Sequence, residues 1–398
     1  MPSISQRAQS MPPSPIRKLA PYADAAKAKG VHIFHLNIGQ PDVLPPDQFW
    51  DAIKAHSQGV LAYSNSAGIA ELRNKAAEKY TEMGIPVSPE EVLVTTAGSE
   101  SLSIAMSVLC DPGDEVIVPE PMYANYIGFS NAIGVKIVPL PTHIEDNFAL
   151  PPISEFEKVV TDRTKAILIC NPNNPTGTIY SEEQLESLRE LALSKNITLI
   201  ADEVYREFVY SGSRPKSVLE LQGLENHSIM IDSVSKRFSL CGARVGFLVS
   251  RNAEFNACAV RFAQARLSSP TLEMHGVLGA MDTPQSYFEE VRDEYRRRRD
   301  LLVKRLRAIP GVICPDIDGA FYATVRLPID DGDRFAQWLL EEFRHNNKTV
   351  MVAPASGFYS TPGHGKNEVR IAYVLNESDL NEAMDCIEEA LRVYPGRV

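Results

Sequence analysis

A regular alternation of apolar runs with helical segments between residues 92 and 250 is the feature that most constrains the fold. Each short apolar run ends in small or polar residues, and most are followed by a segment with helical spacing. Parallel strands need long crossover connections, commonly helices, so this alternation predicts a mostly parallel sheet flanked by helices. The expected fold class is α/β.

Chemically useful side chains follow five successive apolar runs within this region. The carboxyl ends of parallel strands lie along one edge of a sheet, so side chains at these positions are expected to meet there. Each of them taken alone has an ordinary structural explanation, but five such coincidences on one edge favour a ligand site. The five residues are Gly98, Tyr123, Asn174, Asp202 and Lys236.

Lys236 lies in a polar loop between two apolar runs, where it is flanked by hydroxyl side chains and followed by glycines and Arg244. A lysine amine can form a Schiff base with an aldehyde once it has lost its proton, and partial burial or a nearby cation favours that loss. A lone Ser-Lys pair is more often part of a solvated surface loop. The other groups expected at the same edge favour a nucleophile here.

Three further positions carry or attract charge and need partners. Asp202 ends a buried strand, where a carboxylate needs a partner; the alternative is a helix cap or an acid in a salt bridge. The turn through Gly98 into a helix starting at Ser99 offers free amides and a helix dipole, although many such turns bind nothing. Arg370 interrupts an apolar strand and needs either a protein acid or a ligand carboxylate.

Weaker candidates lie in turns and polar segments. Gly39, in the turn formed by residues 37–42, allows close approach of a ligand to the backbone or is a simple turn glycine. Tyr63 can donate its phenol to an anion or pack against the core. Tyr123 can stack on a flat ring or belong to the core.

Composition excludes several other classes of protein. The formal net charge of -11 argues against a nucleic-acid surface and for a soluble, cytoplasmic molecule. The six cysteines contain no C-x-x-C pair, so we expect reduced core residues without a metal site. Neither a secretory leader nor a membrane-spanning apolar stretch is expected. The phosphate-loop and dinucleotide glycine motifs are absent.

The 398 residues suggest two domains or one large α/β unit. From about residue 311 the pattern changes to hairpin-like strands with helices, which predicts an α+β domain. A long helix at 284–309 is expected to connect the two parts. The N-terminal residues 1–13, which are rich in serine and proline, are expected to form a mobile arm.

Taken together, these residues resemble the class I/II aminotransferases among the fold-type I enzymes that depend on pyridoxal 5'-phosphate (PLP), and most of all the bacterial aspartate aminotransferases. The resemblance runs from about residue 14 to the C-terminus. It rests on Asn37–Asp42, Tyr63, Ala97–Ser99, Asn171–Gly177, Asp202–Tyr205, Ser233–Lys236, Gly242–Gly246 and Arg370.

The resemblance implies a fold of two domains in a homodimer with shared active sites. The large PLP-binding domain, expected at residues 46–284, would contain a mostly parallel sheet of the seven-stranded type flanked by helices. The smaller α+β domain would combine both chain ends, residues 14–45 with 285–398. A winged-helix regulator is a poor alternative, because too few residues precede the matched region. A nicotinamide oxidoreductase would need the missing glycine fingerprint.

The resemblance also implies a role for each candidate residue. Lys236 would hold PLP as an internal aldimine and then act as general base and acid, while Asp202 would pair with the pyridinium nitrogen. Asn174 and Tyr205 would bind the phenolate oxygen of the ring, and Tyr123 would stack on its face. The phosphate would be held by Gly98, Ser99, Ser233, Ser235 and Arg244, with Tyr63 reaching the phosphate of the neighbouring subunit.

The substrate end implied by the resemblance contains Arg370, which would bind the α-carboxylate with help from Gly39 and Asn174. The expected reaction moves an amino group between L-aspartate and 2-oxoglutarate. The alternatives are an aminotransferase for a neutral or aromatic amino acid, such as methionine, alanine, leucine or tyrosine, or a PLP-dependent β-lyase.

The second carboxylate of aspartate needs its own cation. In one large bacterial group a lysine follows the glycine before the phosphate-binding helix and helps to hold this carboxylate. Here Ser99 occupies that position, and the adjacent Glu100 would repel an acid. We therefore expect Arg17, together with Lys18, to face the distal carboxylate. The alternative is that both are solvated residues at the start of a helix.

Overall fold

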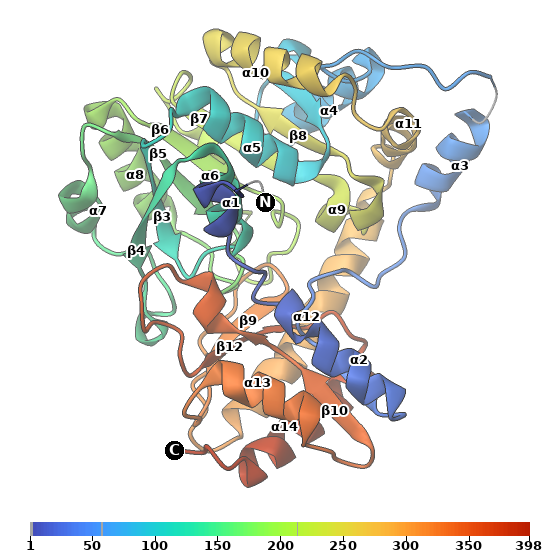
Figure 1. The fold of residues 1–398 in the computed structure, drawn as a ribbon. Helices are drawn as coiled ribbons and strands as arrows, with labels where there is room; N and C mark the ends of the chain where they lie inside the picture. Colours follow the sequence, from blue (N-terminus) through green and yellow to red (C-terminus); the bar gives the residue numbers. More distant parts are fainter. Residues whose placement is uncertain (1–2, 57–58, 213) are drawn as a thin grey trace.

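A seven-stranded sheet forms the larger part of the computed structural model, which describes residues 3–56, 59–212 and 214–398 (Figure 1). The strand order is β2-β8-β7-β6-β5-β3-β4, and β8 runs antiparallel to both of its neighbours. The other pairs are parallel. The strands are β2 (Val92–Thr95), β3 (Glu115–Glu120), β4 (Lys136–Pro141), β5 (Thr164–Cys170), β6 (Thr198–Asp202), β7 (Ser228–Ser233) and β8 (Gly246–Val249). The predicted α/β class with a mostly parallel sheet is confirmed.

Helices cover both faces of this sheet, which explains why its strands are almost continuously apolar. Alternate residues of one strand enter different cores: Val92 and Val94 pack with one set of helices, and Leu93 packs with the other. The helices of this part are α3 (Asp47–His56), α4 (Ala70–Glu82), α5 (Ala97–Leu109), α6 (Asn125–Ile133), α7 (Ile153–Val159), α8 (Glu182–Lys195), α9 (Val234–Arg237), α10 (Ala253–Arg266) and α11 (Thr271–Ala280).

The smaller part combines both ends of the chain. The N-terminal strand β1 (His32–His35) pairs in parallel with β10 (Lys348–Met351), and a separate antiparallel sheet has the order β11-β12-β9. These strands are β9 (Tyr322–Arg326), β11 (Ala353–Pro354) and β12 (Glu368–Ala372), and the helices are α2 (Ala20–Ala28), α13 (Gly332–Glu341) and α14 (Glu377–Val393). Their side chains form one core that includes residues from both chain ends. The exact domain boundaries stay a prediction.

The long helix α12 (Gln285–Arg307) runs from the larger part into the smaller one, as the sequence predicts (Figure 1). Short 3-10 turns connect other elements: η1 (Arg17–Leu19), η2 (Pro89–Glu91), η3 (Ile144–Asp146), η4 (Val218–Glu220), η5 (Cys241–Ala243) and η6 (Ala355–Phe358). In the N-terminal arm, the short helix α1 (Gln6–Gln9) lies beside α6. The predicted mobility of this arm stays a prediction.

Three further findings concern cysteines, membrane spans and metal ligands. All six cysteines are free of disulfide bonds. Across the described residues, no helix is long and apolar enough to cross a membrane, and no group of three or more side chains is arranged to hold a metal ion.

Candidate active site

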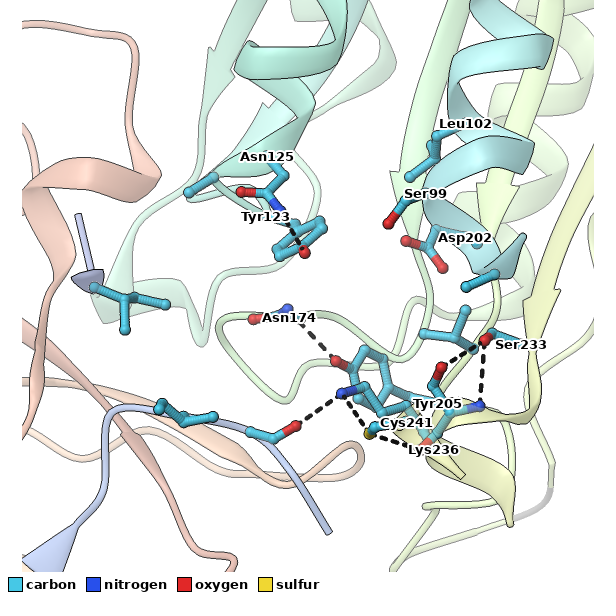
Figure 2. Close-up of a pocket in the computed structure, with 18 of the residues that line it drawn as sticks. Ser99, Leu102, Tyr123, Asn125, Asn174, Asp202, Tyr205, Ser233, Lys236 and Cys241 are labelled. Carbon is cyan, nitrogen blue, oxygen red and sulfur yellow. Dashed lines mark hydrogen bonds between the residues drawn. The ribbon is translucent and has the colours of Figure 1, made fainter. Parts of the chain in front are cut away.

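A cavity of about 460 Å³ lies at the carboxyl ends of the central strands (Figure 2). It brings together all of the candidate residues except Tyr63 and Lys18, although these come from segments far apart in the sequence. The candidates that line it are Arg17, Gly39, Gly98, Ser99, Tyr123, Asn174, Asp202, Tyr205, Ser233, Ser235, Lys236, Arg244 and Arg370.

Lys236 reaches the cavity from α9, the short helix that follows β7. The Ser233 hydroxyl caps this helix by accepting a hydrogen bond from the Ser235 amide at 3.2 Å. The half-buried Lys236 Nζ donates to the Gly39 carbonyl at 2.7 Å and lies 3.8 Å from Cys241 Sγ (Figure 2). The amine therefore stands inside the cavity without a carboxylate partner among the described residues, as a nucleophile requires.

Asp202 ends β6 and is buried, with one carboxylate oxygen paired and the other free. Its Oδ2 accepts a hydrogen bond from the Tyr126 hydroxyl at 2.8 Å. Its Oδ1 has no hydrogen-bond partner within the described part of the chain. Burial raises the pKa of Asp202 to about 6, against the opposing effect of the Tyr126 hydrogen bond. A buried acceptor without a donor is costly, so this oxygen is suited to a ligand that brings an N–H group.

Arg370 is buried on β12 and links the loop at residues 171–177 to the N-terminal segment. Its Nη1 donates to Asn174 Oδ1 at 3.1 Å, and its Nη2 donates to the Asn37 carbonyl at 2.6 Å. The guanidinium lies 4.5 Å from the Tyr322 ring centroid, and its Nε has no partner among the described residues. Burial lowers the pKa of Arg370, so an anion entering beside it would restore lost charge stabilisation.

Tyr205 and Tyr322 form an aromatic wall of the cavity beside Asn174, and their hydroxyls are in contact. Tyr205 Oη lies 3.5 Å from Asn174 Nδ2 and 3.0 Å from Tyr322 Oη. The Gly39 backbone lies against the Tyr322 side chain, because a Cβ added to Gly39 would lie 1.7 Å from the Tyr322 hydroxyl oxygen. A glycine is therefore required at Gly39 by a protein side chain. The sequence had suggested close approach of a ligand or a simple turn.

The first turn of α5, which begins at Ala97, presents Gly98 and Ser99 to the cavity. Gly246 on β8 permits this turn, because a Cβ at Gly246 would lie 2.6 Å from the Ala97 carbonyl carbon. The prediction that Glu100 repels an acidic substrate needs correction. Glu100 accepts from the Thr96 amide at 2.5 Å and pairs with Arg266 at 2.9 Å, so its charge is neutralised outside the cavity lining.

The remaining candidates lie at the mouth of the cavity or away from it. Arg17 is exposed at the mouth, and its guanidinium forms no hydrogen bond or ion pair with the described residues. Lys18 does not share this role, because its Nζ pairs with Asp333 at 2.5 Å outside the cavity lining. Tyr63 is 81% exposed and lies outside the lining of this cavity. A role in a neighbouring subunit stays a prediction.

Several residues of the site were missed by the sequence analysis. Tyr126 contacts Asp202, Asn125 donates to the Tyr123 hydroxyl at 2.7 Å, and Tyr322 and Cys241 line the cavity. Tyr126 and Asn125 stand in the same polar segment after β3 as Tyr123, which was the available signal. Tyr322 lies within an apolar strand and carried no such signal.

Comparison with known proteins identifies the family. The model of aminotransferase class I and II matches residues 31–387. Aromatic-amino-acid aminotransferase 2 of Thermococcus litoralis is 33% identical over an alignment of 399 positions that covers 98% of each chain. The aspartate/prephenate aminotransferase of Thermus thermophilus is 33% identical over 97% of this chain and 98% of that one. A solved structure of a single mutant of Thermus thermophilus aspartate aminotransferase matches with a TM-score of 0.90 at 32% identity, covering 98% of this chain and 100% of that chain. The chain therefore belongs to the class I and II aminotransferases.

Proposed function

We propose that this aminotransferase uses PLP to move the amino group of L-aspartate to 2-oxoglutarate. Three arginines line the cavity, and we assign Arg244 to the phosphate; the observation that carries the substrate proposal is the position of the other two. Arg370 is buried at its wall, and Arg17 stands at its mouth without a protein partner among the described residues. A dicarboxylate substrate needs two cationic groups of this kind.

The residues present fit PLP, the cofactor on which this family depends. Lys236 offers an amine for the aldehyde, and the unpartnered Oδ1 of Asp202 offers an acceptor for the ring nitrogen. The start of α5 offers backbone amides at Gly98 and Ser99 for a phosphate. These three groups stand at three different places around one cavity (Figure 2).

Bound PLP supplies an electron sink for charge that develops at the substrate α-carbon. In the proposed reaction, Lys236 would hold the cofactor through Nζ; the freed amine would then remove the α-proton of the amino donor as general base and deliver a proton as general acid in a 1,3-shift. Asp202 Oδ1 would accept a hydrogen bond from the ring N–H. Asn174 and Tyr205 would bind the phenolate oxygen, and Tyr123 would stack on the ring.

Substrate and phosphate would be held by separate groups. Arg370 donates two of its five N–H groups to protein acceptors, which leaves three donors for an α-carboxylate. Gly39 and Asn174 border the same space. We assign the phosphate to Gly98, Ser99, Ser233, Ser235 and Arg244, with Tyr63 completing the site of a neighbouring subunit in a homodimer.

A neutral or aromatic amino acid is the second candidate substrate. The cavity lining includes Ile16, Ile38, Leu102 and Tyr123, which suit an apolar side chain. The similarity to a protein named as an aromatic-amino-acid aminotransferase also favours this candidate.

A panel of amino donors with 2-oxoglutarate as acceptor tests the proposal. We expect L-aspartate to give the highest kcat/KM. If methionine, leucine or an aromatic donor exceeds aspartate by about tenfold or more, the aspartate assignment is wrong and the second candidate replaces it.

A further inference from the structure

Glu120, the last residue of β3, is completely buried beside a loop of the smaller part. Its carboxylate accepts hydrogen bonds from the backbone amides of Ser360 at 2.6 Å and Thr361 at 3.2 Å. It forms no ion pair with the described residues. A buried carboxylate is expensive unless it is well bonded, so these two amides are its main compensation.

The loop held by Glu120 packs against the arginine of the substrate end. Two residues after Glu120, the Met122 amide donates to the Phe358 carbonyl at 2.8 Å. The Phe358 ring centroid lies 4.9 Å from the Arg370 guanidinium, which also contacts Tyr322. The position of one aromatic neighbour of Arg370 therefore depends on the end of β3.

The same loop also supports the segment that carries Arg17. Gly357 leaves room for Pro15, because a Cβ on Gly357 would lie 2.2 Å from the Pro15 side chain. The adjacent Ser356 hydroxyl donates to Asp333 at 2.6 Å, and Asp333 pairs with Lys18. The loop thus contacts the surroundings of both arginines.

We propose that Glu120 is a positioning residue for recognition of the substrate carboxylate. Its carboxylate fixes the loop at residues 355–361 against the large sheet, and the loop in turn places Phe358 on Arg370. This inference rests on the proposed role of Arg370 in binding the α-carboxylate. Glu120 itself touches neither substrate nor cofactor in this scheme.

The test compares Glu120→Gln with a matched control, Glu115→Gln. Glu115 is a buried acid at the other end of the same strand, where it bonds Lys136 and Thr161. We expect Glu120→Gln to speed amide hydrogen exchange at Ser360 and Thr361 by about tenfold. The NH2 group that replaces one carboxylate oxygen accepts no hydrogen bond, and the remaining amide oxygen is a weaker acceptor than a carboxylate for the two amides. Glu115→Gln should leave this exchange unchanged.

Binding to the holoenzyme provides the second measurement. The probe is 2-methylalanine, which carries an α-carboxylate but has no α-proton, and its binding is followed by the absorbance of the cofactor. Glu120→Gln should lower the affinity of the holoenzyme for this probe by about tenfold, while the spectrum of the holoenzyme without the probe stays unchanged. Phe358→Leu should weaken the probe in the same direction while exchange at Ser360 and Thr361 stays at the wild-type rate.

Arg370→Gln separates failure of this inference from failure of the proposed function. If Arg370→Gln weakens the probe but Glu120→Gln and Phe358→Leu bind it normally, the role of Glu120 is refuted and that of Arg370 stands. If Arg370→Gln binds the probe like wild type, the carboxylate assignment itself fails. Should Glu120→Gln not fold, normal probe binding by Phe358→Leu would still refute the proposal.

Discussion

The two ends of the cavity are built from different parts of the molecule. The end assigned to the cofactor takes Asp202, Ser233 and Asn174 from the ends of neighbouring strands or the loop that follows one, and all three are buried. The end assigned to the substrate takes the exposed Arg17 from the N-terminal segment and the buried Arg370 from a strand of the smaller sheet.

This difference separates shared chemistry from specificity. Groups on strand ends are held by the packing of a large sheet, so their geometry depends little on any single loop. Groups on loops and chain ends change position and identity with less effect on the fold. We therefore expect substitutions at the first end to affect every substrate alike, and substitutions at Arg17 to affect some substrates and not others.

The largest effect is expected for Lys236→Ala, which removes the proposed covalent carrier and the proposed proton-transfer group together. We expect kcat to fall by at least about 10³–10⁴-fold with every amino donor, because a positioned acid and base alone contributes about 10²–10⁴. Borohydride treatment of the wild type, followed by peptide mapping, should find the reduced pyridoxyl group on Lys236. Its recovery from another lysine would refute the assignment.

The next largest effect is expected for Asp202→Asn. Activity should fall by about 10²–10³-fold, since the amide brings no charge to stabilise a protonated ring. The cofactor-free variant should nevertheless be more stable than wild type by about 1–3 kcal/mol at pH 7.5, because burial raises the pKa of Asp202 from 3.8 to about 6 and one pKa unit corresponds to about 1.4 kcal/mol.

The sign follows from proton binding. The folded protein holds the Asp202 proton more tightly than the unfolded chain does, so the wild type loses stability as the pH rises from about 4 to about 6. The asparagine variant lacks this loss, and the two proteins should therefore converge below about pH 4. Urea unfolding of both proteins at pH 7.5 and in this acidic range measures the difference. An equal difference at both pH values would contradict the raised pKa.

The sequence predicted the buried end of the cavity well for a physical reason. Apolar runs such as β5 and β6 can be recognised from the local sequence. In a parallel sheet, the residues at the carboxyl ends of the strands lie along one edge, so their proximity follows from the strand prediction alone. The predictions for Asn174, Asp202 and Lys236 as cavity residues needed nothing else. Their proposed chemical roles stay predictions.

Other elements gave weaker local signals. Strand β4 contains Pro139 and Pro141 and lies at the edge of the sheet, where proline is tolerated but hides the strand pattern. Helix α6 includes glycine and asparagine, which have low helix propensity. Both elements were absent from the sequence-based prediction.

Contacts between distant segments could not be predicted where the parallel sheet does not bring the segments together. The overlap that forbids a side chain on Gly39 involves Tyr322, which is almost 300 residues away in the chain. The errors at Glu100 and Lys18 have a related cause. Each was judged by its neighbour in sequence. Successive residues point about 100° apart on an α-helix such as α5 and about 120° apart on a 3-10 turn such as η1, so neighbouring side chains reach different partners.

The smallest effect is expected for Arg17→Ala, and this variant tests the distinction between the two ends most directly. Arg17 is exposed, so solvent and salt weaken its attraction for a carboxylate. We expect kcat/KM for L-aspartate to fall by about five- to tenfold at low salt, while the values for L-alanine and L-methionine change little. Raising the salt concentration should reduce the difference between variant and wild type for aspartate.

Lys18→Ala is the matched control, because Lys18 carries the same charge one residue away but pairs with Asp333 outside the cavity lining. If general attraction of anions to the N-terminal segment explained the effect, both variants would lower kcat/KM for L-aspartate equally. If Arg17 binds the distal carboxylate, only Arg17→Ala should lower the ratio of aspartate to methionine turnover. An unchanged ratio in Arg17→Ala would remove the second cation from the substrate end, and with it the main support for a dicarboxylate substrate.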